Sequence, residues 1–580
     1  MSLGWTKPGP DLQAQAVQLA KNSDVAIVYA NLFESEGRDL PGIDLPDDQN
    51  NLIEAVAAAN PNTIVVLNTG SAVTMPWLDH VKGVFEAWYP GQESGNAIAA
   101  LLFGDVNPSG KLPVTFPASL AQVPAATPAQ WPGVGGKVQY SEGLDVGYRW
   151  YDAKNITPLF PFGYGLSYTT FRFSNLHLSA PKLAEHGRIE VTAAVTNTGT
   201  RAGAEVAQLY LGDPASTGEP VNQLKGFQKV YLRPGQTKHV HFSVTAQDAS
   251  TWNTLAHGWT LGAGTYAVRV GDSSRSLPLA GTFRVTRTVG PRYTTITAPA
   301  VVRPGSTVSV TTQFTNGATT PARHAVTTLT LPSGWTAHST TPATFRVVAP
   351  GAVTTTAWQV TVPAQAPGGR ATLSAATTYA GPGGQSPSVG TSDVDVAYAD
   401  LAAAFDTVGV TDDANPTVGN FDGAGYSYSA QALASVGVTP AGAVKSRTTT
   451  FTWPDVPAGR PDDVTTAGQA IALSGSGSSL GLLGAGTNGT QTGPITVTYT
   501  DGTTSAATVT LADWYSNAPV AGCTLVVTTP YWNRPAGSTF PADHKVSLYA
   551  AEIPLDQGKQ VAYVTLPSNP RLHFFAATVH

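Results

Sequence analysis

The chain has 580 residues, enough for about four domains of usual size, and its net charge is −6 with only 12% of residues charged. Lysines and arginines are scattered without a basic run, which argues against a nucleic-acid-binding protein. No apolar segment reaches the roughly 20 residues that span a bilayer, and the one cysteine, Cys523, cannot form an intrachain disulfide.

The first 118 residues or so alternate helical and strand patterns, which predicts parallel βαβ units. The expected strands are 25–30, 63–67, 83–88 and 112–116. The expected helices are one with Leu12, Ala16 and Leu19 on one face, a second at 48–59, and a third at 94–103 with Ser94 as a candidate cap. Four strands are few for a doubly wound domain, so we expect a sheet that is incomplete at its amino end.

The rest of the chain is loop-rich and then strand-rich, which predicts a multidomain protein of the α/β plus all-β class. A partial α/β sandwich with an aromatic linker is expected over 1–170, followed by three β-sandwich domains. These are a fibronectin type III-like domain at 171–287, a second Ig-like sandwich at 288–397 and a jelly-roll-like sandwich at 398–580. In the last domain, Asp501-Gly502 is expected to be a hairpin turn between strands 494–500 and 506–511.

The acidic stretch Glu34-Ser35-Glu36-Gly37-Arg38-Asp39 is the best candidate for chemistry. It directly follows the expected strand 25–30, and open α/β sheets bind ligands at the carboxyl ends of their strands. A glutamate there can act as a general acid if the fold keeps it protonated near neutral pH. The alternative is a solvated acidic loop without a catalytic role.

Five segments resemble, in the same order, motifs of glycoside hydrolase family 3. They are Glu36-Gly37-Arg38-Asp39 with Leu45-Pro46 and Gln49 (acid/base loop), 87–95 (strand-to-helix turn), 107–117 (end of the second catalytic domain), and 146–151 with 160–168 (the approach to a fibronectin type III-like domain). The resemblance covers about residues 10–287. The 289–397 block looks like a sandwich module often attached to secreted glycosidases, and the last block resembles appended domains of bacterial glycosidases.

The resemblance implies a retaining β-glycosidase, which needs two carboxyl groups about 5–5.5 Å apart. Glu36 matches the family's acid/base position, whereas the family's aspartate nucleophile belongs to an amino-terminal (β/α)₈ barrel that this sequence does not show. We therefore expect the carboxyl-terminal portion of a secreted or extracellular enzyme for terminal β-linked sugars. The portion should be inactive alone and need no cofactor or metal, and its partners should be the missing barrel and an oligo- or polysaccharide. No signal peptide is visible, because Met1-Ser2-Leu3-Gly4 leads directly into folded-looking sequence, as if the start had been removed.

Glu34 is the rival of Glu36, because in an extended loop both side chains point the same way. The neighbouring Gly37 favours Glu36, and Glu34 is expected at the rim or in solvent. Arg38 should point away from Glu36 and pair with Asp39 or Asp44, because a nearby arginine would favour the charged form of the acid. The remaining acidic residues are expected to cap the next helix, namely Asp44, Asp47 and Asp48.

Other features leave two interpretations open. Glu93 either approaches the same sheet edge or favours a helix amino end, and the aromatic residues of 148–168 either stack on sugars or pack between domains. The aromatic residues of the last domain suggest carbohydrate binding or a core: Trp453, Trp514, Tyr515, Tyr531 and Trp532. Asp422-Gly423 and Asp462-Asp463 are Ca²⁺ ligands or turns. The alternative function is a non-catalytic carbohydrate-binding or surface-attachment protein.

Overall fold

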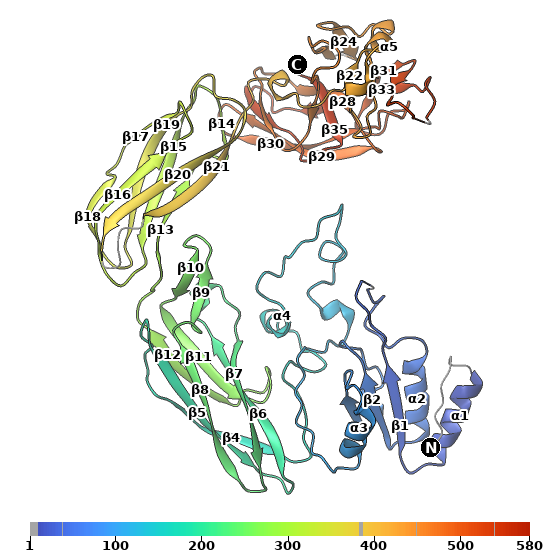
Figure 1. The fold of residues 1–580 in the computed structure, drawn as a ribbon, viewed down its shortest axis with the longest axis vertical. Coiled ribbons are helices and arrows are strands. Elements are labelled where there is room, and N and C mark those ends of the chain that lie inside the picture. Colours follow the sequence, from blue (N-terminus) through green and yellow to red (C-terminus); the bar gives the residue numbers. More distant parts are fainter. Residues whose placement is uncertain (1–9, 38, 382–386, 448, 539) are drawn as a thin grey trace. The chain divides into compact units, whose positions relative to one another are not determined.

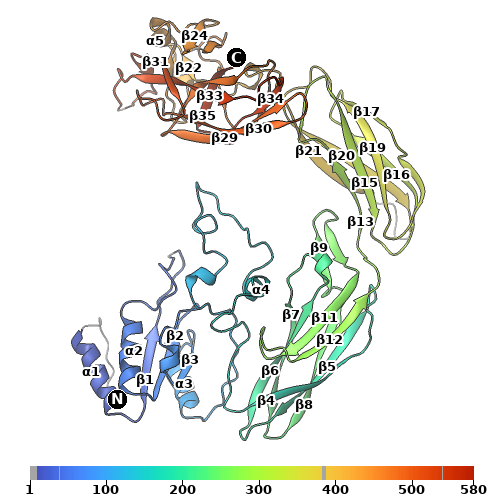
Figure 2. The same ribbon diagram turned by 180° about the vertical axis from the view of Figure 1, so that it is seen from behind.

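The computed structural model describes residues 10–37, 39–381, 387–447, 449–538 and 540–580. They form two compact units, Met1–Pro291 and Arg292–His580, each of which is described by itself (Figures 1 and 2). Within these described ranges, no helix is long and apolar enough to cross a membrane.

A three-stranded parallel sheet opens the first unit (Figure 1). Its strands, in the order β1-β2-β3, are β1 (Ala26–Asn31), β2 (Thr63–Asn68) and β3 (Gly83–Glu86). The accompanying helices are α1 (Pro10–Lys21), α2 (Gln49–Ala59) and α3 (Ser94–Leu102). Val65 and Leu67 of the central strand are fully buried and pack with Ile53 of α2. The first three predicted strands and all three helices are thus confirmed, with ends shifted by a few residues.

The predicted strand 112–116 is wrong. Leu112 N–H donates instead to the carbonyl of Tyr164 at 2.8 Å, and Phe116 forms a single antiparallel bridge with Phe160. The backbone groups of this segment are therefore satisfied by the aromatic linker, and the sheet keeps three described strands. The Ser94 cap is also wrong, because Glu93 holds the N-cap position of α3 and makes no side-chain cap bond.

The outer edge of β1 is open, because no described strand pairs with it. Ile27 and Tyr29 of this strand are 52% and 51% exposed, and Phe33 just after it is also exposed. Large apolar side chains on a free sheet edge are unusual in a finished domain, since such an edge is a template for further strand pairing. This is consistent with a sheet that is incomplete on the β1 side.

The aromatic linker, which includes α4 (Tyr148–Ala153), packs the sheet domain against the first sandwich. The ring of Tyr148 stacks on Phe162 with centroids 4.8 Å apart, and its hydroxyl accepts a hydrogen bond from Leu224 N–H at 2.9 Å. A buried ion pair, Lys111 Nζ to Glu205 Oε1 at 2.9 Å, joins the same two parts. The packing interpretation of the 148–168 aromatics therefore accounts for Tyr148 and Phe162.

The first sandwich has two antiparallel sheets and one protruding hairpin (Figure 2). The first sheet is β4-β5-β8, made of β4 (Phe171–Leu178), β5 (Arg188–Asn197) and β8 (Thr237–Thr245). The second is β12-β11-β6-β7, made of β6 (Gly203–Gly212), β7 (Gln223–Leu232), β11 (Gly264–Gly271) and β12 (Leu279–Val285). The hairpin consists of β9 (Ser250–Asn253) and β10 (Gly258–Leu261).

The second unit begins with another two-sheet sandwich. One sheet, β13-β15-β19-β17, contains β13 (Arg292–Thr297), β15 (Thr307–Asn316), β17 (Thr336–Ser339) and β19 (Val353–Thr361). The other, β14-β21-β20-β16-β18, contains β14 (Val301–Val302), β16 (Ala322–Thr330), β18 (Thr344–Val348), β20 (Gly369–Ala380) and β21 (Ser388–Val396).

The last domain is a larger β-sandwich with one short helix, α5 (Ala430–Ser435). Its first main sheet, β26-β35-β28-β33-β31, contains β26 (Val464–Thr465), β28 (Ser479–Gly486), β31 (Thr524–Thr529), β33 (Val546–Pro554) and β35 (Leu572–Val579). Its second main sheet, β27-β34-β29-β30, contains β27 (Ala470–Ala472), β29 (Gln491–Tyr499), β30 (Thr504–Leu511) and β34 (Val561–Thr565). Smaller pairings involve β22 (Val410–Thr411), β23 (Ser427–Ser429), β24 (Ala443–Ser446), β25 (Thr449–Thr452) and β32 (Trp532–Asn533). The predicted hairpin at Asp501-Gly502 is confirmed, because β29 and β30 pair antiparallel across it.

Candidate functional site

Three loops meet at the carboxyl edge of the three-stranded sheet and surround Glu34. Ser71 Oγ, from the loop after β2, donates to Glu34 Oε1, and the hydroxyl of Tyr89 lies 3.3 Å from Glu34 Oε2. Gly70 leaves room for this arrangement, because a Cβ at that position would lie 1.8 Å from Glu34 Oε2 and 2.7 Å from Cε2 of Tyr89 and would displace the carboxylate. Glu34 is therefore half-buried and held by its neighbours, and is not a freely solvated side chain.

Glu86, the last residue of β3, is a second carboxyl group at the same edge. Thr69 Oγ1 donates to its Oε2 at 3.2 Å, and Trp88 N–H donates to its Oε1 at 2.9 Å. Burial raises the pKa of Glu86 to about 7, and the nearby charge of Glu34 adds to the rise. Glu86 was not predicted as a site residue from the sequence, because it lay inside the expected strand 83–88. The available signal was a glutamate that ends an apolar strand at the ligand-binding edge of the sheet.

Glu36 is placed differently from Glu34. It lies in a turn and is exposed, and its side chain makes no hydrogen bond with any described residue. Gly37 adopts a φ of +74°, a left-handed conformation that favours glycine and bends the loop. Glu36 and Gly37 form the turn, so Glu36 stands at the bend and Glu34 before it. Glu36 presents its carboxyl group to the outside of the domain.

The loop carries other charged residues that were singled out from the sequence, among them Arg38, Asp39, Asp44 and Asp48. Arg38 lies outside the described residues, and Asp39 is exposed. Thr74 Oγ1 donates to Asp44 Oδ1. Asp48 occupies the N-cap position of α2 but makes no side-chain cap bond, so its predicted capping bond is absent.

Glu93 lies at the end of a helix, and the tryptophans singled out in the last domain lie in its core. Glu93 is exposed at the N-cap of α3 and accepts a hydrogen bond from Asn96, which supports the helix-end interpretation. Trp453, Trp514 and Trp532 are buried in the core of the last domain, whereas Tyr515 is 38% exposed and stacks on His544 with ring centroids 3.6 Å apart. Within the described ranges, no group of three or more histidine, cysteine, aspartate or glutamate side chains is arranged to hold a metal ion.

Comparison with protein families divides the chain into four matched segments. Residues 8–168 match the glycosyl hydrolase family 3 C-terminal domain, and residues 205–274 match a fibronectin type III-like domain. Residues 302–380 match the NPCBM-associated, NEW3 domain of alpha-galactosidase, and residues 397–580 match an AziU2-like beta-sandwich domain. The chain thus carries the C-terminal domain of family 3 and a fibronectin type III-like domain, with further β-sandwich domains appended.

Several similar curated proteins are beta-glucosidases. Thermostable beta-glucosidase B of Acetivibrio thermocellus is 45% identical over 283 residues, which are 48% of this chain and 37% of that protein. Beta-glucosidase B of Emericella nidulans is 46% identical over 285 residues, 46% of this chain and 33% of that protein. Among solved structures, DesR, a beta-glucosidase from Streptomyces venezuelae in complex with D-glucose, is 44% identical over 47% of this chain and 35% of that chain, with a TM-score of 0.45. The chain spans about a third of the length of these relatives.

Proposed function

We propose that this chain, which carries the C-terminal domain of glycoside hydrolase family 3, is the carboxyl-terminal part of a secreted retaining β-glycosidase. It would supply Glu36 as the acid/base for hydrolysis of terminal β-linked sugars. The second carboxylate, an aspartate nucleophile, would come from a barrel domain that the described residues do not contain. The family match over residues 8–168 is the observation that carries this proposal.

The setting of Glu36 suits a group that acts on a substrate held by a neighbouring domain. It is exposed beside a left-handed glycine and is not engaged by described residues of its own domain. An acid/base residue must protonate the leaving oxygen and later activate water, so its carboxyl group must be free to approach the sugar.

Glu86 is the rival on electrostatic grounds, because a carboxyl group with a pKa of about 7 suits general-acid catalysis. However, both of its oxygens accept hydrogen bonds within the domain, from Thr69 and from the backbone of Trp88. We assign Glu86 and Glu34 to positioning roles: they hold the loops on which Glu36 is carried.

The first test is the activity of the chain by itself. The purified 580-residue chain should not hydrolyse a panel of aryl β-glycosides, because one member of a cooperating pair of catalytic groups gives little rate enhancement alone. Turnover that disappears on Glu36→Gln would show that the chain holds a complete site and would overturn the proposed division of labour.

The second test uses the enzyme that contains this chain together with a barrel domain. Glu36→Gly should slow hydrolysis by about 10²–10⁴-fold for poor leaving groups, because these need the proton most. Dinitrophenyl glycosides should still form the covalent intermediate, which accumulates because no base activates water. Azide needs no base, so it should restore turnover and give the β-glycosyl azide with net retention.

Glu34→Gly and Glu86→Gly are the matched controls for this test. Both remove the carboxyl group and leave the same space for azide, and neither should show leaving-group dependence or azide rescue. If one of them behaves as expected for Glu36 and the Glu36 variant does not, that residue is the acid/base and our assignment is wrong.

A further inference from the structure

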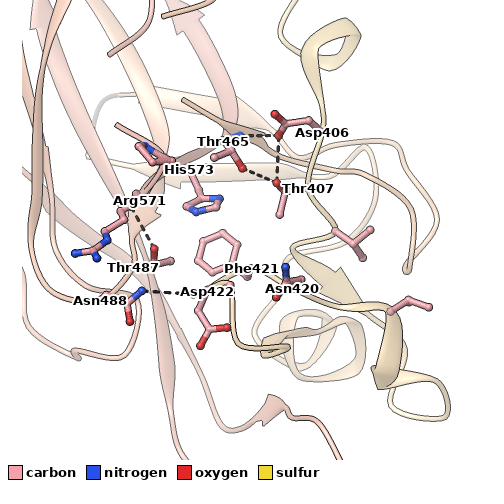
Figure 3. A pocket seen from close by; sticks show the side chains of 14 residues that line it. Asp406, Thr407, Asn420, Phe421, Asp422, Thr465, Thr487, Asn488, Arg571 and His573 are labelled. Atoms are coloured by element: carbon pink, nitrogen blue, oxygen red, sulfur yellow. Dashed lines mark hydrogen bonds between the residues drawn. The ribbon is translucent and has the colours of Figure 1, made fainter. Parts of the chain in front are cut away.

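The last domain has a surface hollow of about 490 Å³ that the proposed glycosidase chemistry does not use. Figure 3 shows how side chains from distant parts of the sequence meet in it. They come from the stretches 406–408 and 418–423, from 570–573 at the start of β35, from the end of β26 and from the residues that follow β28. The volume lies within the range of about 300–1,000 Å³ that is typical of small-ligand sites.

The inner wall of the hollow is formed by two buried rings, Phe421 and His573, whose centroids are 4.4 Å apart (Figure 3). His573 Nδ1 lies 2.8 Å from Asp463 Oδ2. Burial lowers the pKa of His573 to about 4, so the ring is neutral, and burial also raises the pKa of its partner Asp463 well above the usual value. The other nitrogen, Nε2, makes no hydrogen bond with a described residue and is left to bind a ligand hydroxyl.

The rim combines hydrogen-bond acceptors and donors. Asp406 Oδ1 accepts from Thr465 N–H at 2.8 Å, and Asp422 Oδ1 accepts from Ala424 N–H at 2.8 Å. The second oxygen of each carboxylate accepts no hydrogen bond from the described chain. Arg571 is exposed and makes no ion pair with any described residue.

Two asparagine side chains on the rim are also only partly used. Asn420 Oδ1 accepts from Gly425 N–H at 2.9 Å, whereas its amide group donates to no described residue. Asn488 donates over a long 3.4 Å to the carbonyl of Asp422. The loops therefore fix these side chains in place and still leave donors and acceptors available to a ligand.

We propose that this hollow binds a neutral sugar residue of a saccharide chain, through hydrogen bonds to Asp406, Asp422 and Arg571. Each sugar hydroxyl both donates and accepts, and so does this lining of carboxylates, amides and a guanidinium. A simple anion would be repelled by the two carboxylates, and an apolar ligand would leave the polar groups without partners. Phe421 and His573 are buried and tilted by 42° to each other, so they close the hollow from behind and the polar rim makes the contacts with the sugar.

The test measures the binding of methyl glycosides to the whole 580-residue chain by saturation-transfer NMR. The probes are the methyl β-glycosides of glucose, galactose and xylose and methyl α-mannoside, with soluble β-glucan, xylan and galactomannan as the corresponding polymers in affinity electrophoresis. At least one glycoside should bind. Arg571→Ala and Asn488→Ala should each weaken that binding by about tenfold, because each removes a hydrogen-bonding group from the rim.

Lys445→Ala is the matched control, because Lys445 is an exposed cation on β24 of the same domain that does not line the hollow. It should leave binding unchanged. Failure of every glycoside and polymer to bind would overturn the proposal, and so would binding that all three variants retain equally. Binding of inorganic phosphate or Ca²⁺ in place of the glycosides, lost in the Arg571 and Asn488 variants, would overturn the assignment to sugars. None of these outcomes depends on glycosidase activity, so this proposal fails or survives separately from the proposed function.

Discussion

Replacing Asp462 by asparagine should stabilise the last domain, and the gain should grow as the pH rises. Asp462 lies next to Asp463 in the core, and Gly409 N–H donates to its Oδ1 at 2.7 Å. It also borders a small cavity of about 50 Å³ lined mainly by apolar side chains. Burial raises the pKa of Asp462 to about 9, and the negative charge of Asp463 adds to the rise. Protonated Asp462 can then donate to Asp463, whose buried Oδ1 accepts no other hydrogen bond from the described residues.

The sign of the effect follows from proton linkage. Below pH 3.8 the carboxyl group is protonated in both the folded and the unfolded chain, so it imposes no penalty. As the pH rises toward 9, the unfolded chain releases the proton and the folded chain keeps it, which lowers the free energy of unfolding by about 1.36 kcal/mol per pH unit. Asparagine removes this loss. The difference in the free energy of unfolding between the variant and wild type should therefore grow by about 4 kcal/mol from pH 5 to pH 8.

The single cysteine of the chain makes the measurement specific to this domain. Cys523 is half-buried and packs against the core of the last domain, so its protection from a thiol reagent reports the unfolding of that domain alone. Wild type and Asp462→Asn are equilibrated in a urea series at pH 5 and pH 8 and then pulsed with a methanethiosulfonate reagent. The fraction of protein labelled at Cys523 is measured by intact mass. The midpoint and slope give the free energy of unfolding at each pH.

Asp501→Asn is the control. The pKa of Asp501 is lowered by hydrogen bonds from Thr503, so this residue is charged in both states between pH 5 and pH 8. Its replacement should give no difference between the two pH values. The reasoning is refuted if Asp462→Asn gains the same amount at both pH values, because Asp462 would then be ionised in the folded domain.

Three further predictions concern the first unit. Gly70→Ala should displace Glu34 and destabilise the sheet domain by about 1–3 kcal/mol, because the added Cβ overlaps the carboxylate; hydrogen exchange of peptides from 26–37 and 63–89 should rise. Lys111→Met should cost about 3–5 kcal/mol, because it leaves Glu205 buried without its partner, and calorimetry should show much of that loss recovered when Glu205 is replaced by leucine as well. Glu86→Gln should remove a fall in stability between about pH 4.5 and pH 7 and gain roughly 2 kcal/mol at pH 8, allowing for partial solvent screening; equal protection of residues 63–89 from exchange in both proteins at pH 8 would contradict this.

The elements that the sequence predicted correctly are those whose partners are local or whose burial is complete. Strand β2 is a continuous apolar run, and α2 has one apolar face, so each pattern is sufficient by itself. The hairpin around Asp501 is set by its turn residues. The segment 112–116 failed because its hydrogen-bond partners are more than forty residues away, at Phe160 and Tyr164. Such pairing leaves no periodicity in the sequence.

The candidate site was predictable only as a loop. The strand before it fixed where Glu34 and Glu36 would lie, but their different burial depends on a turn at Gly37 and on Ser71 and Tyr89 from other loops. The hollow in the last domain was beyond prediction for the same reason. His573 meets its partner Asp463 across 110 positions of sequence, and only the fold brings them together.

The open edge of β1 has a practical consequence for the isolated chain. The Gln49 side chain binds both backbone groups of Asn31, the last residue of β1. The rest of this edge pairs with no described strand, so together with the exposed Ile27 and Tyr29 it can accept an added strand from an extended peptide of suitable register. The chain produced alone should therefore self-associate through this edge as its concentration rises. A separately added peptide that pairs with this edge should suppress the self-association, so the edge is a point at which a second polypeptide can be made to dock.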